Sequence, residues 1–116
     1  MKKEFRLRKA SDFKAVLDQR HPAEKNRSVS VFYAPNTLAH VRIGISVSSK
    51  LGDAVTRVRI RRQIRAQINE TDVLTKPFDI VIIARPGYLE NSYQENLAIL
   101  KDAFTRLSLP QKGEKA

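Results

Sequence analysis

The stretch from residue 53 to residue 69 constrains the fold most, because it predicts one helix with two chemically different sides. Asp53 is a suitable N-cap, since its short side chain can accept a hydrogen bond from the first helix amides. At helical spacing Ile60, Ile64 and Ile68 fall along one edge. An apolar edge of this kind packs against another layer, so the chain is expected to fold as a layered structure around this helix.

The other side of the same helix is strongly basic. Within nine residues the helix carries Arg57, Arg59, Arg61, Arg62 and Arg65. No carboxylate lies between Asp53 and Glu70. A solvated helix face usually mixes acids with bases at i, i+4 spacing, and that remains the alternative interpretation. Guanidinium groups without interleaved acids repel one another unless phosphates or solvent separate them, so the pattern favours contact with nucleic acid.

The composition of the whole chain supports this interpretation. The chain has 116 residues, with 22 Lys and Arg against 12 Asp and Glu, for a net charge of +10. Such a surplus on a small body favours a polyanionic partner, and a membrane surface is the weaker choice because no apolar stretch is long enough to span a bilayer. The first residues lack the apolar stretch of a signal peptide, and there is no cysteine for disulfides or thiolate chemistry. A cytoplasmic location is expected.

One domain is expected over residues 1–109, followed by a frayed tail at 110–116. Ser11 is placed as the cap of a first helix that buries Phe13, Val16 and Leu17 and ends before the His-Pro pair at 21–22. A last helix is expected to begin with a capping box, Ser-x-x-Glu at 92–95. Its apolar stripe comprises Leu97, Leu100, Phe104 and Leu107.

Three segments have the pattern of β-strands. Residues 28–34 alternate with Val29, Val31 and Tyr33 on one side, and residues 40–48 alternate more regularly. In the second segment Val41, Ile43, Ile45 and Val47 point one way, and Arg42, Gly44, Ser46 and Ser48 point the other. Residues 78–84 are almost continuously apolar, which suits a central strand covered on both faces. The fold class is α+β: a single-domain α/β sandwich of order α-β-β-(β)-α-β-α.

The sequence offers little machinery for catalysis by the protein itself. His21 and His40 have no metal-ligand spacing, the acids form no obvious pair, and no glycine-rich phosphate loop is present. Asp79 is the one acid inside an apolar strand, and it is expected to hydrogen-bond to backbone or to an arginine. These features argue against an autonomous enzyme.

Residues 46–65 read S-V-S-S-K-L-G-D-A-V-T-R-V-R-I-R-R-Q-I-R. They resemble the signature of the bacterial ribonuclease P protein subunit, S-V-S-K-K-x-G-N-A-V-x-R-N-x-x-K-R-x-x-R. The resemblance extends from R-L-R-K-x-x-D-F at 6–13 to F-D-I-V-I-I-A-R at 78–85. An ordered match over this length is far more specific than a basic patch.

The resemblance implies that the catalyst is an RNA and that the protein is an accessory subunit, inactive alone, with no catalytic side chain. It implies binding to that RNA and to the 5′ leader of precursor tRNA, and hydrolysis of one phosphodiester to give the mature tRNA 5′ end. Mg²⁺ is then held mainly by RNA oxygens, which suit this hard cation. The implied fold resembles domain 2 of ribosomal protein S5. Its β-α-β crossover is left-handed, against the general right-handed rule.

The resemblance also assigns two sets of site residues. The residues expected to contact the catalytic RNA are Lys50, Arg57, Val58, Arg59, Arg61, Arg62 and Arg65. Those expected to line a cleft for the precursor leader are Arg8, Lys9, Phe13, Leu17, Tyr33, Arg42, Ser46 and Ser48. Unpaired bases stack on aromatic rings in such clefts, and simple core packing is the alternative for both rings.

Three positions depart from the family pattern. Val58 and Asp53 each stand where the family has asparagine, and Leu17 stands where a second cleft aromatic is common. Two other functions stay open: a structural RNA-binding protein of ribosomal type, without a catalytic partner, and an autonomous nuclease.

Overall fold

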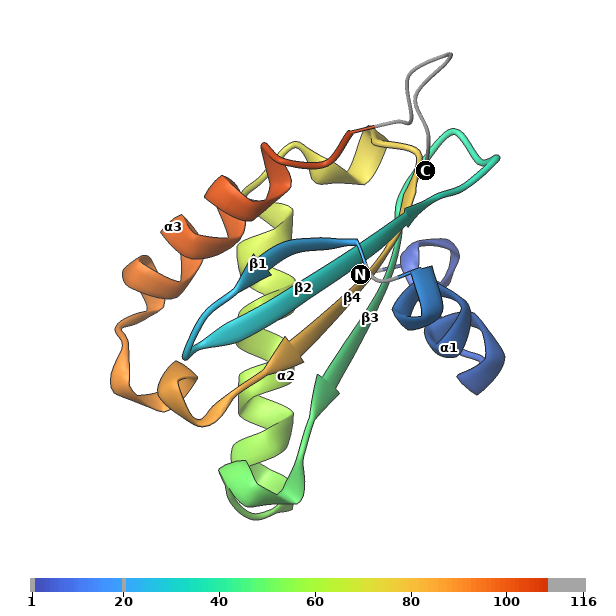
Figure 1. Cartoon of the computed structure of the whole chain (residues 1–116). Coiled ribbons are helices and arrows are strands. Elements are labelled where there is room, and N and C mark those ends of the chain that lie inside the picture. Colours follow the sequence, from blue (N-terminus) through green and yellow to red (C-terminus); the bar gives the residue numbers. More distant parts are fainter. Residues whose placement is uncertain (1, 20, 109–116) are drawn as a thin grey trace.

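The structure, a computed structural model, describes residues 2–19 and 21–108, and the expected tail at 110–116 lies outside them. Figure 1 shows a four-stranded sheet with helices on both sides. The regular elements are α1 (Ala10–Gln19), β1 (Pro22–Lys25), β2 (Val29–Pro35), β3 (Arg42–Val47), α2 (Ala54–Asn69), β4 (Phe78–Ala84) and α3 (Tyr93–Phe104). Short 3₁₀ turns precede or link them at η1 (Lys3–Phe5), η2 (Ser49–Leu51), η3 (Val73–Thr75) and η4 (Pro86–Glu90).

The sheet has the order β1-β2-β4-β3. Strands β1 and β2 pair antiparallel, as do β2 and β4, whereas β3 and β4 are parallel and joined through α2. In Figure 1, α2 lies behind the sheet, and β4 lies to the left of β3 while both strands run downward. This arrangement makes the crossover left-handed, as the resemblance implied. The α+β sandwich is confirmed, and β1 is the additional short strand.

Helices α2 and α3 cover one face of the sheet, termed the core face. The edge residues of α2, Ile60, Ile64 and Ile68, are fully buried there. The alternating strand residues join them, with Val31 from β2, Ile43 from β3 and Ile80 from β4 in the same cluster. The strand alternation and the apolar edge of α2 are therefore confirmed.

Helix α1 lies on the opposite face, termed the α1 face (Figure 1). Side chains paired across neighbouring strands share a face, so the register places three rows here: Ser30–Ile83–Ser46, Phe32–Val81–Gly44 and Ala34–Asp79–Arg42. A smaller apolar cluster centred on Leu7, Val16, Ala34 and Val81 joins α1 to this face. Strand β4 is thus covered on both faces, as its continuous apolar sequence predicted.

The helix ends follow local hydrogen-bonding chemistry. Asp53 caps α2 by accepting from the Thr56 amide at 2.9 Å, and this bond lowers the pKa of its carboxyl group. Ser92 and Glu95 form the predicted capping box of α3. The expectation for Ser11 is wrong, because α1 already begins at Ala10 and Ser11 lies inside its first turn.

Candidate RNA interface

The arginines of α2 lie in two settings. Arg57, Arg61 and Arg65 are half-buried beside the apolar edge, whereas Arg59 and Arg62 point outward and are exposed. Within residues 2–19 and 21–108 none of the five forms an ion pair. The Nε atoms of Arg57 and Arg65 are buried without a hydrogen-bond partner in that part of the chain. The helix therefore presents charge that the described residues leave uncompensated.

A hollow of about 230 Å³ lies where this helix meets the N-terminal segment. Four arginines line it, Arg6 and Arg8 from the segment and Arg61 and Arg65 from α2, without a carboxylate. The Nε of Arg6 is also buried without a partner among the described residues. Burial, and then the charges of Arg6 and Arg61, lower the pKa of Arg65. An anionic group in this hollow would relieve the repulsion and supply the missing acceptors.

The sequence expectation did not include Arg6 in either set. A parallel bridge between Arg6 and Ile43, with the Leu7 amide donating to the Ile43 carbonyl at 3.0 Å, brings the segment to the edge of β3. This contact joins residues far apart in sequence, so no local pattern predicts it. The basic run that contains Arg6 was the one available signal.

Val58 lies on the outward side of α2, and 45% of its surface is exposed. It is therefore not a contact against the sheet. Val55 is also exposed on this helix. Lys50 is exposed in η2, where its amide donates to the Ser48 hydroxyl at 3.3 Å. Ser48 thus caps that turn, beyond the end of β3.

Phe13 is half-buried on the α1 face and packs with the small apolar cluster. Its ring occupies the space above Gly44: a Cβ atom added there would lie 2.3 Å from the Phe13 Cζ. A contact that close is impossible for any larger residue without displacing the ring. Gly44 therefore allows α1 to approach β3 and seats an aromatic ring at the edge of the exposed surface.

Tyr33 lies on the opposite side of the sheet from Phe13. It packs against the main core, edge-on to Phe78 with ring centroids 5.5 Å apart, and near His21 at 5.9 Å. The expectation that Phe13 and Tyr33 line one cleft is therefore wrong, because successive residues of a strand alternate between faces. The half-buried ring that shares the cluster with Phe13 is Phe32, which the sequence expectation missed.

Arg42 does point to the α1 face, but its guanidinium is occupied. It donates through Nε and Nη2 to both carboxylate oxygens of Asp79, at 2.9 and 2.6 Å, and this hydrogen bonding raises the Arg42 pKa. Asp79 thus bonds to an arginine, as predicted. Arg42 projects from the polar side of β3, as expected, but Asp79 and Asp12 neutralise its charge.

The other members of the expected leader set are accessible. Arg8, Lys9 and Ser46 are exposed, and Leu17 is 37% exposed on α1. We define the leader surface as Phe13, Leu17, Phe32, Ser46 and Ile83. At the end of β4, Arg85 is exposed and donates from Nε to the Ser30 hydroxyl at 2.7 Å.

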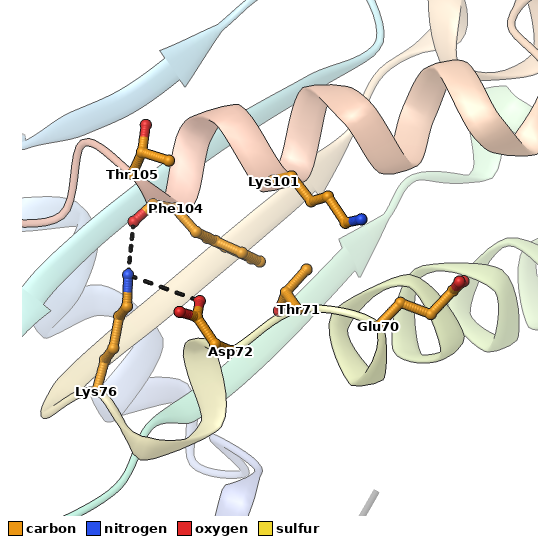
Figure 2. Close-up of a pocket in the computed structure, with 7 residues that line it drawn as sticks. All are labelled: Glu70, Thr71, Asp72, Lys76, Lys101, Phe104 and Thr105. Atoms are coloured by element: carbon orange, nitrogen blue, oxygen red, sulfur yellow. Dashed lines mark hydrogen bonds and ion pairs between the residues drawn. The ribbon is translucent and has the colours of Figure 1, made fainter.

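A second hollow, of about 320 Å³, opens between the ends of α2 and α3 (Figure 2). Its lining balances Lys76 and Lys101 against Glu70 and Asp72. The Lys76 ammonium donates to the Phe104 carbonyl at 3.2 Å and lies 3.9 Å from Asp72, so it stabilises the end of α3 (Figure 2). This balanced lining lacks the uncompensated charge of the first hollow.

Two further observations concern metals and membranes. Across the described part of the chain, no three His, Asp or Glu side chains converge as metal ligands would. Over the same residues, no helix has both the length and the apolar character needed to cross a membrane.

The chain is similar to known proteins in both sequence and fold. The family model for ribonuclease P matches residues 1–108. Ribonuclease P protein components from Streptococcus thermophilus and Streptococcus pneumoniae are 41% and 43% identical over 95 and 96 residues. These matches cover 82% of this chain and 85% and 77% of those proteins.

Solved structures of two RNase P proteins have a similar fold. The RNase P protein of Staphylococcus aureus superposes with a TM-score of 0.75 at 32% identity, covering 87% of this chain and 93% of that one. The protein from Thermotoga maritima gives 0.77 at 26% identity, covering 89% and 97%. Sequence, fold and the uncompensated basic helix agree, and the chain belongs to the ribonuclease P protein family.

Proposed function

We propose that this protein is the accessory subunit of a tRNA-processing ribonucleoprotein, in which an RNA is the catalyst. The protein binds that RNA through α2 and the N-terminal segment, and it binds the 5′ leader of precursor tRNA through the leader surface. The ribonucleoprotein hydrolyses one phosphodiester bond and leaves the mature tRNA 5′ end. Mg²⁺, a hard cation that prefers oxygen ligands, would be held mainly by RNA oxygens and would supply the metal chemistry.

The observation that carries the proposal is the uncompensated charge around α2. Arg6, Arg61 and Arg65 surround one hollow without a carboxylate, and two of them have buried Nε atoms without partners among the described residues. A guanidinium pairs well with phosphate oxygens, which accept two parallel hydrogen bonds from its planar fork. RNA backbone supplies such phosphates at regular spacing, so binding here needs no particular base sequence.

The leader surface has a different chemistry. Phe13 and Phe32 offer two half-buried rings, and Ser46 offers an exposed hydroxyl, with little charge between them. Unpaired bases stack on such rings without regard to sequence. A precursor leader is single-stranded, whereas the 5′ end of mature tRNA is base-paired, so this surface favours substrate over product.

Sequencing the RNA that co-purifies with the protein from its own host tests the partner. A single structured non-coding RNA that, when reconstituted with the protein, cleaves precursor tRNA supports the proposal. Recovery of ribosomal RNA alone would instead indicate a structural RNA-binding protein. Cleavage by the protein after exhaustive removal of RNA would show an autonomous nuclease.

A further inference from the structure

The ion-pair group formed by Asp12, Arg42 and Asp79 lies beside the leader surface and has no role in the function proposed above. Arg42 and Asp79 sit side by side on the parallel strands β3 and β4 and share a two-bond contact. The side chain of Asp79 is only 13% exposed. Asn36 adds a further hydrogen bond to Asp79 at 3.0 Å, so the carboxylate is held from two sides. The Arg42 fork is therefore fixed relative to the sheet.

The third member of the group comes from α1. An Asp12 carboxylate oxygen lies 3.9 Å from Nη1 of Arg42, and both side chains are about one-third exposed. Over residues 2–19 and 21–108 this is the one ion pair or hydrogen bond between α1 and the sheet. The apolar attachment of α1 is small, with Val16 its one fully buried residue. Beside this apolar packing, Asp12–Arg42 is the one charged contact that ties α1 to the sheet among the described residues.

Asp12 immediately precedes Phe13 in the first turn of α1. The Phe13 ring sits directly above Gly44, so any shift of the helix moves the ring relative to β3. We propose that Asp12 and Arg42 are positioning residues for the leader: Arg42, fixed by Asp79, orients the first turn of α1, and with it the Phe13 ring. This inference rests on the proposed function of the leader surface and adds the residues that set its geometry.

The charges of the group give a second consequence. One guanidinium faces two carboxylates, so the group itself offers no net positive charge, whereas Arg8, Lys9 and Arg85 are exposed. A leader phosphate is therefore attracted toward these exposed cations and not toward Asp79. The group orients α1 without competing for the RNA backbone.

The test compares Asp12→Asn with Asp18→Asn. Asp18 lies on the same helix, but it pairs with Lys14 of that helix at 2.7 Å and not with the sheet. Both substitutions remove one negative charge, so their general effects on RNA affinity match. The quantity measured is the leader contribution, defined as the Kd of mature tRNA divided by the Kd of precursor tRNA for the reconstituted ribonucleoprotein. Hydrogen exchange of the α1 amides is measured in parallel.

Asp12→Asn is expected to lower the leader contribution about threefold, the range measured for partly exposed ion pairs, and to speed exchange in α1. Asp18→Asn is expected to leave both at the wild-type level. Arg42→Lys, which keeps the charge but loses the fork, should behave like Asp12→Asn. Equal leader contributions and equal α1 exchange in the two aspartate variants would overturn the inference. A wild-type leader contribution of one would instead refute leader binding itself.

Discussion

If the basic helix α2 contacts the catalytic RNA, the affinity for that RNA should fall steeply as the salt concentration rises. Each phosphate contact adds about −0.7 to −0.9 to the slope of log affinity against log salt. Four arginines, Arg57, Arg61, Arg62 and Arg65, lie within one side of α2 and form no ion pair among the described residues. If each meets one phosphate, raising salt from about 50 to 200 mM weakens binding about 80-fold.

Replacing Arg62 or Arg65 with alanine removes one contact, and the same change of salt should then weaken binding only about 30-fold. The assay is filter binding or fluorescence anisotropy with labelled catalytic RNA at five or more salt concentrations. Lys101→Ala is the matched control, because it removes one charge from the exposed side of α3. Its slope should equal that of the wild type. If the slopes of the Arg62 and Arg65 variants equal that of the Lys101 variant, α2 is not part of the interface.

Three further outcomes follow from the same structure. Phe13→Ala or Phe32→Ala should each weaken binding of precursor tRNA by roughly 1–3 kcal/mol and leave mature tRNA unaffected, whereas Tyr33→Ala should chiefly lower Tm because its ring lies in the main core. Val58→Asn adds two donors and one acceptor at an exposed position, so it should tighten binding to the catalytic RNA without lowering Tm; a lowered Tm would show a packing role. The pKa of the Asp53 carboxyl is lowered in the folded protein, so the ionised cap stabilises α2 when the pH is above the pKa of the unfolded state, and this stabilisation is lost as the pH falls below about 4. In Asp53→Asn the decline of Tm in acid should therefore be less steep than in the wild type.

Local chemistry predicted much of the fold. The Asp53 cap, the buried edge at Ile60, and the capping box at Ser92 each depend on residues within one or two helical turns. These features can be predicted from the sequence alone, because the groups that hydrogen-bond or pack with one another are close together along the chain. Ser11 is the exception, because Ala10 already belongs to α1 and the cap therefore lies earlier than the preference for serine suggested.

The candidate site was predicted only in part, and its two errors have different causes. Strand parity already placed Tyr33 with Val29 and Val31, toward the core, and therefore placed Phe32 on the other face. Matching aromatic residues by family position disregarded that parity and selected a ring on the opposite face of the sheet from Phe13. Arg6 was missed for a different reason: its place beside Arg65 depends on the bridge to β3, which only the folded chain creates.

Arg42 shows why exposure alone does not identify a binding residue. Its position on the polar side of β3 was predicted correctly, and so was an arginine partner for Asp79. Because the two residues bind one another, Arg42 is not an available cation on this face. Charge on a surface must be counted together with the groups that neutralise it.

The claim that the protein holds the precursor leader is tested most directly by comparing two RNAs with and without the protein. Affinities for precursor tRNA and for mature tRNA are measured for the catalytic RNA alone and for the reconstituted ribonucleoprotein at matched salt. Adding the protein should tighten precursor binding at least about tenfold, the equivalent of one stacked base, and leave mature tRNA nearly unchanged. An equal gain for both RNAs would contradict a leader-binding role and leave only general charge neutralisation.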